Sequence, residues 1–376
     1  MIAVVFGTRP EIIKLSPIIR ALSQQRVAFY TIHTGQHYSY NLDRIFIDSL
    51  GLPEPTYHLA VGSGPHGAQT AEIIRRVEEV VSTDPPDVVL VQGDTNSVLG
   101  AAIACAKLHQ VRVGHVEAGL RSYDRAMPEE VNRILTDHVS DLLFAPTPTA
   151  KRILLGEGIP EDKIWLTGNT IVDAVQQNLA IAYTRSTILT DLSLKPKSFV
   201  VLTLHRPENV ANAARLGSLV RALNALSDEL GMPIVCPMHP RTRAALAEHR
   251  PPLELRVVVI DPVGYFDALV LQEQARLVLT DSGGMQEEAC ILGTPCVTLR
   301  ENTERPETLE VGANCLGGVE SESIRRSVEA MLRRDTTWPN PFGDGRAGER
   351  IAAVSAAAVE LPRRAGEHGL LPTRPK

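Results

Sequence analysis

Short runs of β-branched and other apolar residues alternate along this chain with longer segments of helical periodicity. This alternation is typical of βαβ units, in which helices connect neighbouring strands of a parallel sheet. The sequence therefore predicts an α/β fold with doubly wound, Rossmann-like domains. The predicted strands span residues 2–6, 29–33, 88–92, 113–116 and 142–145 in the first half, and 199–204, 234–236, 257–260, 277–280 and 296–299 in the second.

The length of 376 residues exceeds what one hydrophobic core usually supports, so two domains are expected. The alternation pauses in an irregular, Ser- and Thr-rich stretch at 179–197. We place an N-terminal domain at 1–168, a C-terminal domain at 169–345, and one helix with a polar tail at 346–376. Because open α/β sheets bind ligands beyond the carboxyl ends of their strands, we expect the two domains to face a central cleft.

The composition excludes several classes of protein. Hydrophobic residues make up 44% and charged residues 22%, which excludes a disordered or coiled-coil chain. The formal net charge of −6 argues against a nucleic acid partner, because phosphate contacts need a basic surface. No stretch reaches the length of a membrane-spanning helix, and the five cysteines form no C-x-x-C pair. We therefore expect a cytoplasmic protein with no membrane partner.

Charged residues follow three of the predicted strands in the first half. Arg9 and Lys14 lie near a glycine turn that opens a helix, which suits an anion, with solvated surface cations as the alternative. Asp94 follows the third strand, where it could equally cap the next helix. Glu117 follows the fourth, and a partly buried carboxylate there needs a partner, either substrate or the nearby Arg121.

Two further carboxylates, Glu129 and Glu130, open a predicted helix. The helix dipole stabilises them as anions, so they are candidates for binding or acid–base chemistry. Arg133 lies four residues after Glu129, and an ordinary salt bridge within the helix is the alternative interpretation.

Histidine and arginine recur at strand ends in the second half, as His205 with Arg206 and as His239 with Arg241. A lone histidine is more often structural than catalytic. Two such pairs after successive strands favour an anion site.

A further strand of the second half ends in the turn Ser282-Gly283-Gly284, which opens directly into a helix. Bare backbone N–H groups and the positive helix end predict a phosphate site there. Glu288 lies one turn further on, where it could accept hydrogen bonds from a ribose, and Arg305 follows the next strand. A purely structural helix entry is the alternative.

The sequence offers no sign of a cofactor or metal. The first glycine turn is neither a dinucleotide-binding motif nor a P-loop. His33 and His37 lie four residues apart with Gly35 between them, and no His, Cys and Asp set has zinc spacing. We therefore expect a cofactor-free protein without a metal site.

Taken together, the motifs of this chain resemble those of the non-hydrolysing UDP-N-acetylglucosamine 2-epimerases. They occur in family order between about residues 7 and 314: GTRPEIIKLSPII, TGQH, QGDT, HVEAGLRS, PEEVNR, GNTIVDA, HRPEN, MHPRT, DSGGMQEEA and LGTPCVTLRENTERPETLEVGAN. The resemblance implies the glycosyltransferase B-type fold, with a C-terminal helix that crosses back to the first domain, and a homodimer.

The resemblance also implies a reaction, the reversible conversion of UDP-N-acetylglucosamine (UDP-GlcNAc) to UDP-N-acetylmannosamine (UDP-ManNAc) without NAD or metal. UDP is eliminated across C1–C2 to give 2-acetamidoglucal and is then added back, with the proton returned to the opposite face of C2. Such chemistry needs carboxylates near C2 and cations or helix-end N–H donors at the departing diphosphate.

Roles follow for residues that match the family motifs. The implied catalytic residues are Asp94, Glu117, Glu129 and His205. The implied substrate-binding residues are Arg9, Lys14, Glu130, Arg133, Ser282, Gly283, Gly284, Glu288 and Arg305. Positions associated with a second, activating UDP-GlcNAc in some bacterial members are Gln36, His37, Arg206 and His239.

Three alternatives remain open at this stage. Related enzymes act on other UDP-acetamido sugars, such as UDP-2,3-diacetamido-uronic acids or 6-deoxy sugars. A glycosyltransferase of the same architecture would require an acceptor. A non-catalytic sensor would bind the UDP-sugar without exchanging its C2 proton.

Overall fold

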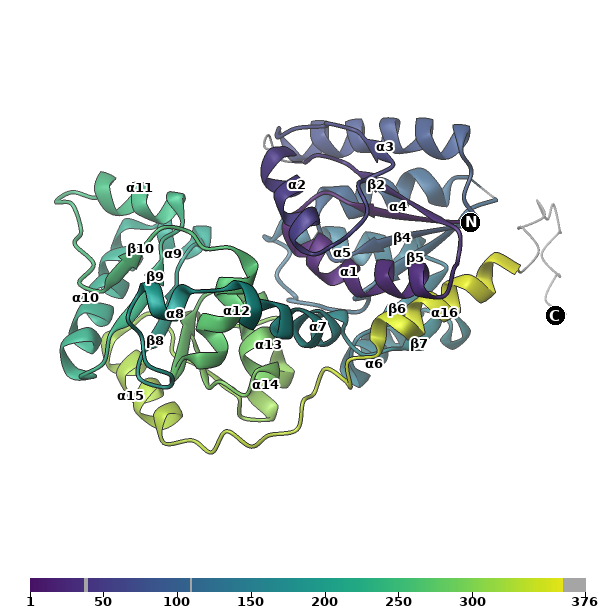
Figure 1. Ribbon diagram of the computed structural model, residues 1–376. Helices are drawn as coiled ribbons and strands as arrows, with labels where there is room; N and C mark the ends of the chain where they lie inside the picture. Colours follow the sequence, from purple (N-terminus) through teal and green to yellow (C-terminus); the bar gives the residue numbers. More distant parts are fainter. Residues whose placement is uncertain (37–39, 109, 361–376) are drawn as a thin grey trace, which may run out of the picture. The chain divides into compact units, whose positions relative to one another are not determined.

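The computed structural model describes residues 1–36, 40–108 and 110–360. The chain forms two compact units (Figure 1): unit 1 comprises Met1–Ala174 with Gly343–Lys376, and unit 2 comprises Val175–Phe342. The chain enters unit 2 within helix α7 (Thr170–Arg185) and leaves it after Phe342. These crossings lie a few residues from the expected domain ends at 168 and 345.

Unit 1 has, within the described ranges, a parallel seven-stranded sheet in the order β3-β2-β1-β4-β5-β6-β7. This is the Rossmann order, which reverses between β1 and β4. The five predicted strands are present, whereas the short outer strands β3 and β7 carry too few residues for a periodic signal. The strands are β1 (Ile2–Phe6), β2 (Phe29–His33), β3 (Tyr57–His58), β4 (Val88–Gln92), β5 (Arg112–Val116), β6 (Leu142–Ala145) and β7 (Ile164–Leu166).

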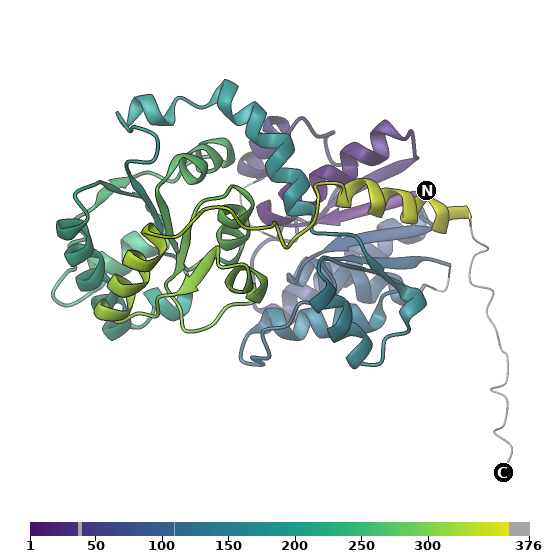
Figure 2. The same cartoon turned by 90° about the horizontal axis from the view of Figure 1, so that it is seen from below.

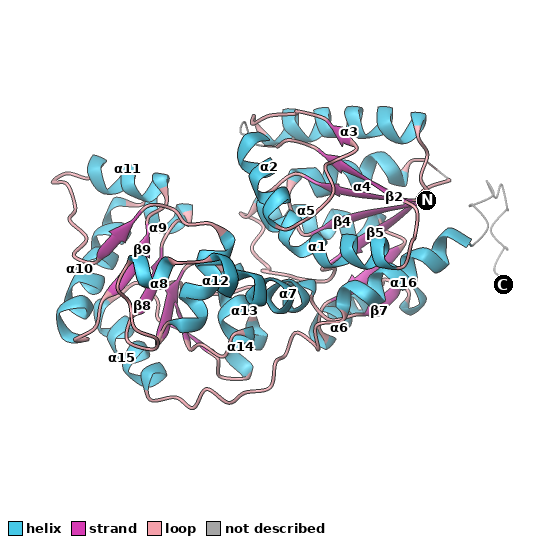
Figure 3. Cartoon of the chain, in the orientation of Figure 1, coloured by secondary structure: helices cyan, strands magenta, loops and turns pink. Residues whose placement is uncertain are grey.

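Helices cover both faces of this sheet, because alternate side chains of each buried strand point to opposite faces (Figures 1 and 3). Ala3 and Val5 of β1 join the core beneath α3 and α4. On the other face α16 contacts α1, β1 and β4, and it lies beside α1 in both views (Figures 1 and 2). The helices are α1 (Arg9–Gln24), α2 (Tyr40–Ser49), α3 (His66–Thr83), α4 (Asn96–Ala106), α5 (Pro128–Val139), α6 (Pro148–Gly156) and α16 (Ala347–Glu360).

Unit 2 repeats the topology with a parallel sheet in the order β10-β9-β8-β11-β12-β13. Its order reverses between β8 and β11, so both units are Rossmann-like and the predicted α/β fold is confirmed. The outer strand β13 was not predicted. The strands are β8 (Val200–Thr203), β9 (Ile234–Pro237), β10 (Val258–Ile260), β11 (Leu277–Thr280), β12 (Cys296–Thr298) and β13 (Asn314–Leu316).

Two apolar layers enclose the sheet of unit 2. Val200 and Leu202 pack with α10 and α15, while Phe199 and Val201 pack with α8 and α12. None of the helices in the described ranges is long and apolar enough to cross a membrane. The helices of unit 2 are α8 (Ile188–Asp191), α9 (Pro207–Val210), α10 (Ala213–Glu229), α11 (Pro240–Glu248), α12 (Tyr265–Gln274), α13 (Gly283–Ile291), α14 (Pro306–Glu310) and α15 (Ser321–Leu332).

Candidate active site

A buried carboxylate joins the two turns that flank the strand-order reversal of unit 1. Glu11, in the first turn of α1, accepts the Gly7 N–H at 2.5 Å and the Thr95 hydroxyl at 2.5 Å. Burial raises the pKa of Glu11 to about 7, although these hydrogen bonds act in the opposite direction. The sequence did not reveal this role, because Thr95 lies 84 residues away along the chain.

The neighbouring Asp94 does not cap α4, so that alternative interpretation is wrong. Thr95 takes this position, and its side chain accepts the Val98 N–H. Asp94 instead pairs with Arg133, whose Nη2 lies 2.7 Å from Asp94 Oδ2. Its carboxylate stays 32% exposed, which leaves it accessible to a ligand.

The two glutamates at the start of α5 have different surroundings. Arg133 pairs with Asp94 and, through Nη1 at 2.6 Å, with Glu130, so the predicted Glu129–Arg133 bridge is not formed. Glu129 is half-buried, and its side chain has no hydrogen bond or ion pair with another residue described in the structure. The other three predicted acids of unit 1, Asp94, Glu117 and Glu130, each form an ion pair within the described ranges.

Glu130 holds the loop before α5. It accepts the Ser122 N–H at 2.8 Å, the Tyr123 N–H at 2.9 Å and the Arg133 guanidinium. Burial would raise the pKa of Glu130, but these hydrogen bonds outweigh it and lower the pKa. These contacts are all internal, and a part in substrate binding stays a prediction.

Glu117 follows β5 in a left-handed backbone conformation, with φ of 72°. Lys14 Nζ lies 2.7 Å from its Oε1, and the Gln92 amide donates to its Oε2. The predicted alternative partner, Arg121, pairs with Asp137 and Glu157 instead. The Lys14 side chain is buried.

Three other residues that the sequence predicted for unit 1 are Arg9, Gln36 and His37. Arg9 is exposed, and its guanidinium lies over the Phe46 ring at 4.9 Å from the centroid. Gln36 Oε1 accepts the Ser97 hydroxyl at 2.8 Å. His37 lies outside the described residues.

The reversal point of unit 2 is organised by Asp281, a fully buried residue after β11. It accepts the backbone N–H groups of His205 and Arg206 at 3.0 and 2.9 Å and the Asn209 amide at 3.1 Å. Its Oδ1 also lies 3.1 Å from His205 Nδ1. Burial opposes ionisation, yet the His205 and backbone contacts lower the pKa of Asp281. Asp281 thereby orients His205, a role that the motif did not reveal.

Helix α13 opens beside this pair. Ser282 occupies the N-cap position, but its side chain makes no capping hydrogen bond. The first N–H groups of the helix and the Ser282 hydroxyl are therefore available to an anion. Glu288 lies further along α13 and accepts the Gln272 amide at 2.7 Å.

A cavity of about 220 Å³ opens at the carboxyl ends of β8 and β9. His205 and His239 both line it, with ring centroids 5.9 Å apart. Burial, followed by the nearby His205 and Arg241, lowers the pKa of His239. The other lining residues are mostly apolar: Val201, Thr203, Leu204, Pro237, Pro262, Val263, Ala268, Leu271 and Met285.

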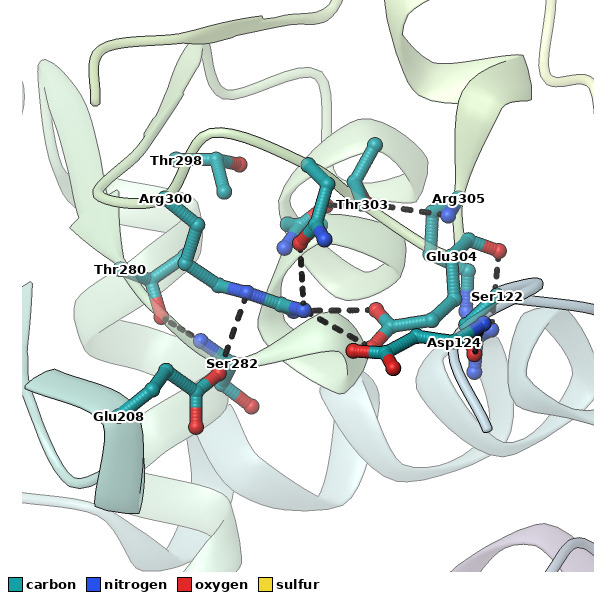
Figure 4. Close-up of polar contacts among 12 residues, drawn as sticks. Ser122, Asp124, Glu208, Thr280, Ser282, Thr298, Arg300, Thr303, Glu304 and Arg305 are labelled. Atoms are coloured by element: carbon teal, nitrogen blue, oxygen red, sulfur yellow. Dashed lines mark hydrogen bonds and ion pairs between the residues drawn. The ribbon is translucent and has the colours of Figure 1, made fainter. Parts of the chain in front are cut away.

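The loop after β12 is braced by an ion pair that the sequence did not indicate (Figure 4). Arg300 forms a bidentate pair with Glu304, with both N···O distances 3.1 Å. Both side chains are buried, and although burial alone would raise the pKa of Glu304, Arg300 lowers it to about 2. Arg305 precedes α14, with Nε 2.7 Å from Glu287 Oε1.

Each unit thus collects a different chemistry at the carboxyl ends of its strands. Unit 1 supplies carboxylates: Gln92 of β4 and Val116 of β5 are register partners, so Asp94 and Glu117 follow neighbouring strands. Unit 2 supplies imidazoles, guanidinium groups and helix-end N–H donors. Within the described ranges, no group of three or more His, Cys, Asp or Glu is arranged to hold a metal ion.

Two Rossmann-like units with these residue sets define a protein of the nucleotide-sugar enzyme class. The chain belongs to the UDP-N-acetylglucosamine 2-epimerase family, whose model matches residues 20–356. The predicted family is therefore confirmed.

Individual relatives agree with this assignment. The chain is 50% identical to a UDP-N-acetylglucosamine 2-epimerase of Methanocaldococcus jannaschii, over 94% of this chain and 98% of the relative. A crystal structure of the M. jannaschii enzyme in complex with UDP-GlcNAc and UDP matches with a TM-score of 0.88, over 95% of this chain and 99% of that one.

More distant relatives include one that is named for a different substrate. The UDP-GlcNAc 2-epimerase structure from Neisseria meningitidis, bound to UDP-GlcNAc, matches at 31% identity with a TM-score of 0.86, over 95% of this chain and 99% of that chain. A UDP-2,3-diacetamido-2,3-dideoxy-D-glucuronate 2-epimerase of Pseudomonas aeruginosa is 42% identical, over 94% of this chain and 99% of the relative. The structural matches confirm the predicted fold class.

Proposed function

We propose that this protein is a non-hydrolysing epimerase that interconverts UDP-GlcNAc and UDP-ManNAc. The observation that carries the proposal is the division of chemistry within one chain: acids at the strand ends of unit 1, and imidazoles, guanidinium groups and a helix N-terminus without a side-chain cap at those of unit 2. Family membership and the 50% identical relatives support it.

In this proposal unit 2 holds the UDP moiety. The cavity beside His205 and His239 has mainly apolar walls, which suit a flat pyrimidine. The N-terminus of α13 would receive a phosphate, Arg305 would add a cation, and His205 would add a hydrogen bond for the departing diphosphate. Glu288 would accept hydrogen bonds from the ribose.

Unit 1 would perform the proton chemistry. A carboxylate removes the C2 proton, the C2–H electrons form the C1=C2 double bond, and the C1–O electrons leave with UDP. Re-addition of UDP oxygen to C1, with a proton delivered to the opposite face of C2, completes the inversion. Asp94, Glu117 and Glu129 are the proposed acids, bases and charge-stabilising groups.

The test is incubation with UDP-GlcNAc in deuterium oxide, followed by NMR. We expect formation of UDP-ManNAc, deuterium at C2 in both sugars and no net release of UDP. Binding without deuterium exchange would indicate a sensor, and product formation only with an acceptor would indicate a glycosyltransferase. Either result would overturn the proposal.

A second candidate substrate is a UDP-2,3-diacetamido-uronic acid, favoured by the 42% identical relative from Pseudomonas aeruginosa. The reaction would be the same, and only the groups at C3 and C5 would differ. Comparing kcat/KM for this sugar, a 6-deoxy analogue and UDP-GlcNAc identifies the preferred substrate.

A cytoplasmic homodimer completes the proposal. All five cysteines are free, which supports a reducing compartment. Leu135 of α5 is exposed, and Val131, one helical turn before it, lines a groove with His66 and Leu99, which supports an association surface. Light scattering of the purified protein would distinguish a dimer from a monomer.

A further inference from the structure

A buried histidine–aspartate pair lies behind the strand ends that carry Asp94 and Glu117. His115 belongs to β5 and Asp137 to α5, and neither side chain is more than 1% exposed. His115 Nδ1 lies 2.6 Å from Asp137 Oδ1. The proposed chemistry uses neither residue, because neither can reach a ligand from the core.

The histidine contacts the turn before Asp94. His115 Nε2 lies 2.9 Å from the carbonyl oxygen of Gly93. Since a carbonyl oxygen only accepts hydrogen bonds, Nε2 carries a proton and donates it. Gly93 has φ of +86°, and this hydrogen bond fixes the peptide that links it to Asp94.

The aspartate contacts the turn after Glu117. Asp137 Oδ2 accepts the Gly119 N–H at 3.1 Å and lies 2.8 Å from Arg121 Nη1. Gly119 also has a positive φ, of +84°. The pair is therefore bonded to the backbone of both turns that carry a proposed catalytic carboxylate.

The backbone conformation of these turns needs support from surrounding residues. Glu117 is not glycine, yet its φ is 72°. Such a conformation costs about 1–3 kcal/mol and persists only where the surrounding structure holds it in place. The His115–Asp137 pair supplies hydrogen bonds to both turns from a side that is closed to solvent. If His115 and Asp137 had only a structural role, they would stabilise the fold but would not orient the Asp94 or Glu117 carboxylate.

We infer that His115 and Asp137 are positioning residues that hold the Asp94 and Glu117 turns in their reactive geometry. This inference rests on the proposed function. Displacement of a reacting group by about 1 Å can cost about 10²-fold in rate. Loss of the pair should therefore lower kcat while leaving the binding of UDP, assigned to unit 2, unchanged.

The test compares Asp137→Asn with Asp141→Asn. Asp141 is a matched control because it is also a buried carboxylate and accepts the Val113 N–H, near the opposite end of β5. We expect Asp137→Asn to lower kcat and C2 deuterium exchange about 10²-fold, with KM and the Kd of UDP within about twofold of the wild type. Asp141→Asn should keep kcat even where its Tm falls equally.

A milder variant, His115→Gln, retains Asp137 with its Gly119 and Arg121 contacts. If Asp137→Asn does not yield folded protein, His115→Gln tests whether the pair positions the two turns. We expect this variant also to lower kcat and to leave UDP affinity unchanged. Wild-type kcat in a folded variant, or equal kcat losses in Asp137→Asn and Asp141→Asn, would overturn the inference. An inactive wild type would instead count against the proposed function.

Discussion

Glu117 shows how much a single residue can reveal about this site. It is a non-glycine residue in a left-handed conformation, buried against Lys14 and Gln92. Strained backbone of this kind clusters at active sites. Asp94 is more exposed and is held by Arg133, so the two carboxylates have different environments, as acids and bases of one reaction need.

We predict that Glu117→Gln and Asp94→Asn each lower turnover about 10²- to 10⁴-fold, because each removes a carboxylate to which we assign proton transfer or charge stabilisation. Both variants should fold and bind UDP. Exposed Glu161, which pairs with Lys151, provides the control Glu161→Gln with unchanged turnover. Turnover by NMR and UDP affinity by calorimetry check this, and normal activity in either variant would remove that residue from its role.

Glu11 leads to a prediction about pH. Its pKa is raised to about 7 in the folded protein, above that of an unfolded glutamate, so its protonated form favours folding. This contribution is complete below about pH 4.5, is lost as the pH rises to about 7, and corresponds to about 3 kcal/mol. Glu11→Gln should therefore gain Tm relative to the wild type by several degrees between pH 5 and 8, measured by calorimetry. Parallel curves for the two proteins would contradict this.

At the scale of elements, the first turn of α13 provides the strongest support for a phosphate site in unit 2. A Cβ on Gly284 would meet only the Ser282 hydroxyl oxygen, at 4.0 Å. The described residues thus leave open space beside Gly284 in the first turn of the helix. A bound phosphate would occupy this space.

We predict that Gly284→Ala weakens UDP binding at least about tenfold, or about 1.4 kcal/mol, because the methyl group crowds the phosphate. Stability should not fall, since alanine restricts the unfolded chain more than glycine does. Gly156 of α6 also has open space around it, so Gly156→Ala is the matched control with wild-type affinity. Calorimetric titration with UDP measures both, and unchanged binding in Gly284→Ala would place the phosphate elsewhere.

The elements were largely predictable because buried parallel strands are continuous apolar runs of distinct length. Strands β3, β7 and β13 were missed because each has only two or three residues, whereas the equally short β10 lies within the apolar run 257–260. Asp94, Glu117 and His205 could be singled out because each directly follows a strand. Glu11, Asp281 and the His115–Asp137 pair could not, since their partners are brought together only by the folded sheet.

At the scale of the whole molecule, the chain returns to unit 1 after completing unit 2. Asp173, in the first turn of α7, accepts the N–H groups of Ala347 and Gly348 at 3.2 and 2.8 Å. It thereby satisfies donors at the start of α16, as an N-cap does. Asp173 therefore joins the start of α16 to α7, the helix within which the chain leaves unit 1.

The contact between α16 and α1 gives the last prediction. Pro17 interrupts the hydrogen bonds of α1, and Gly348 packs directly on it: a Cβ at Gly348 would lie 2.9 Å from the Pro17 carbonyl carbon. Gly348→Ala should therefore force α16 away from α1 and destabilise unit 1 by about 1–3 kcal/mol. The Tm should fall and α16 should become accessible to protease, whereas UDP affinity should persist because the residues proposed to hold UDP lie mainly in unit 2. Unchanged Tm and protease resistance would show that α16 tolerates a larger spacing and contributes little to unit 1.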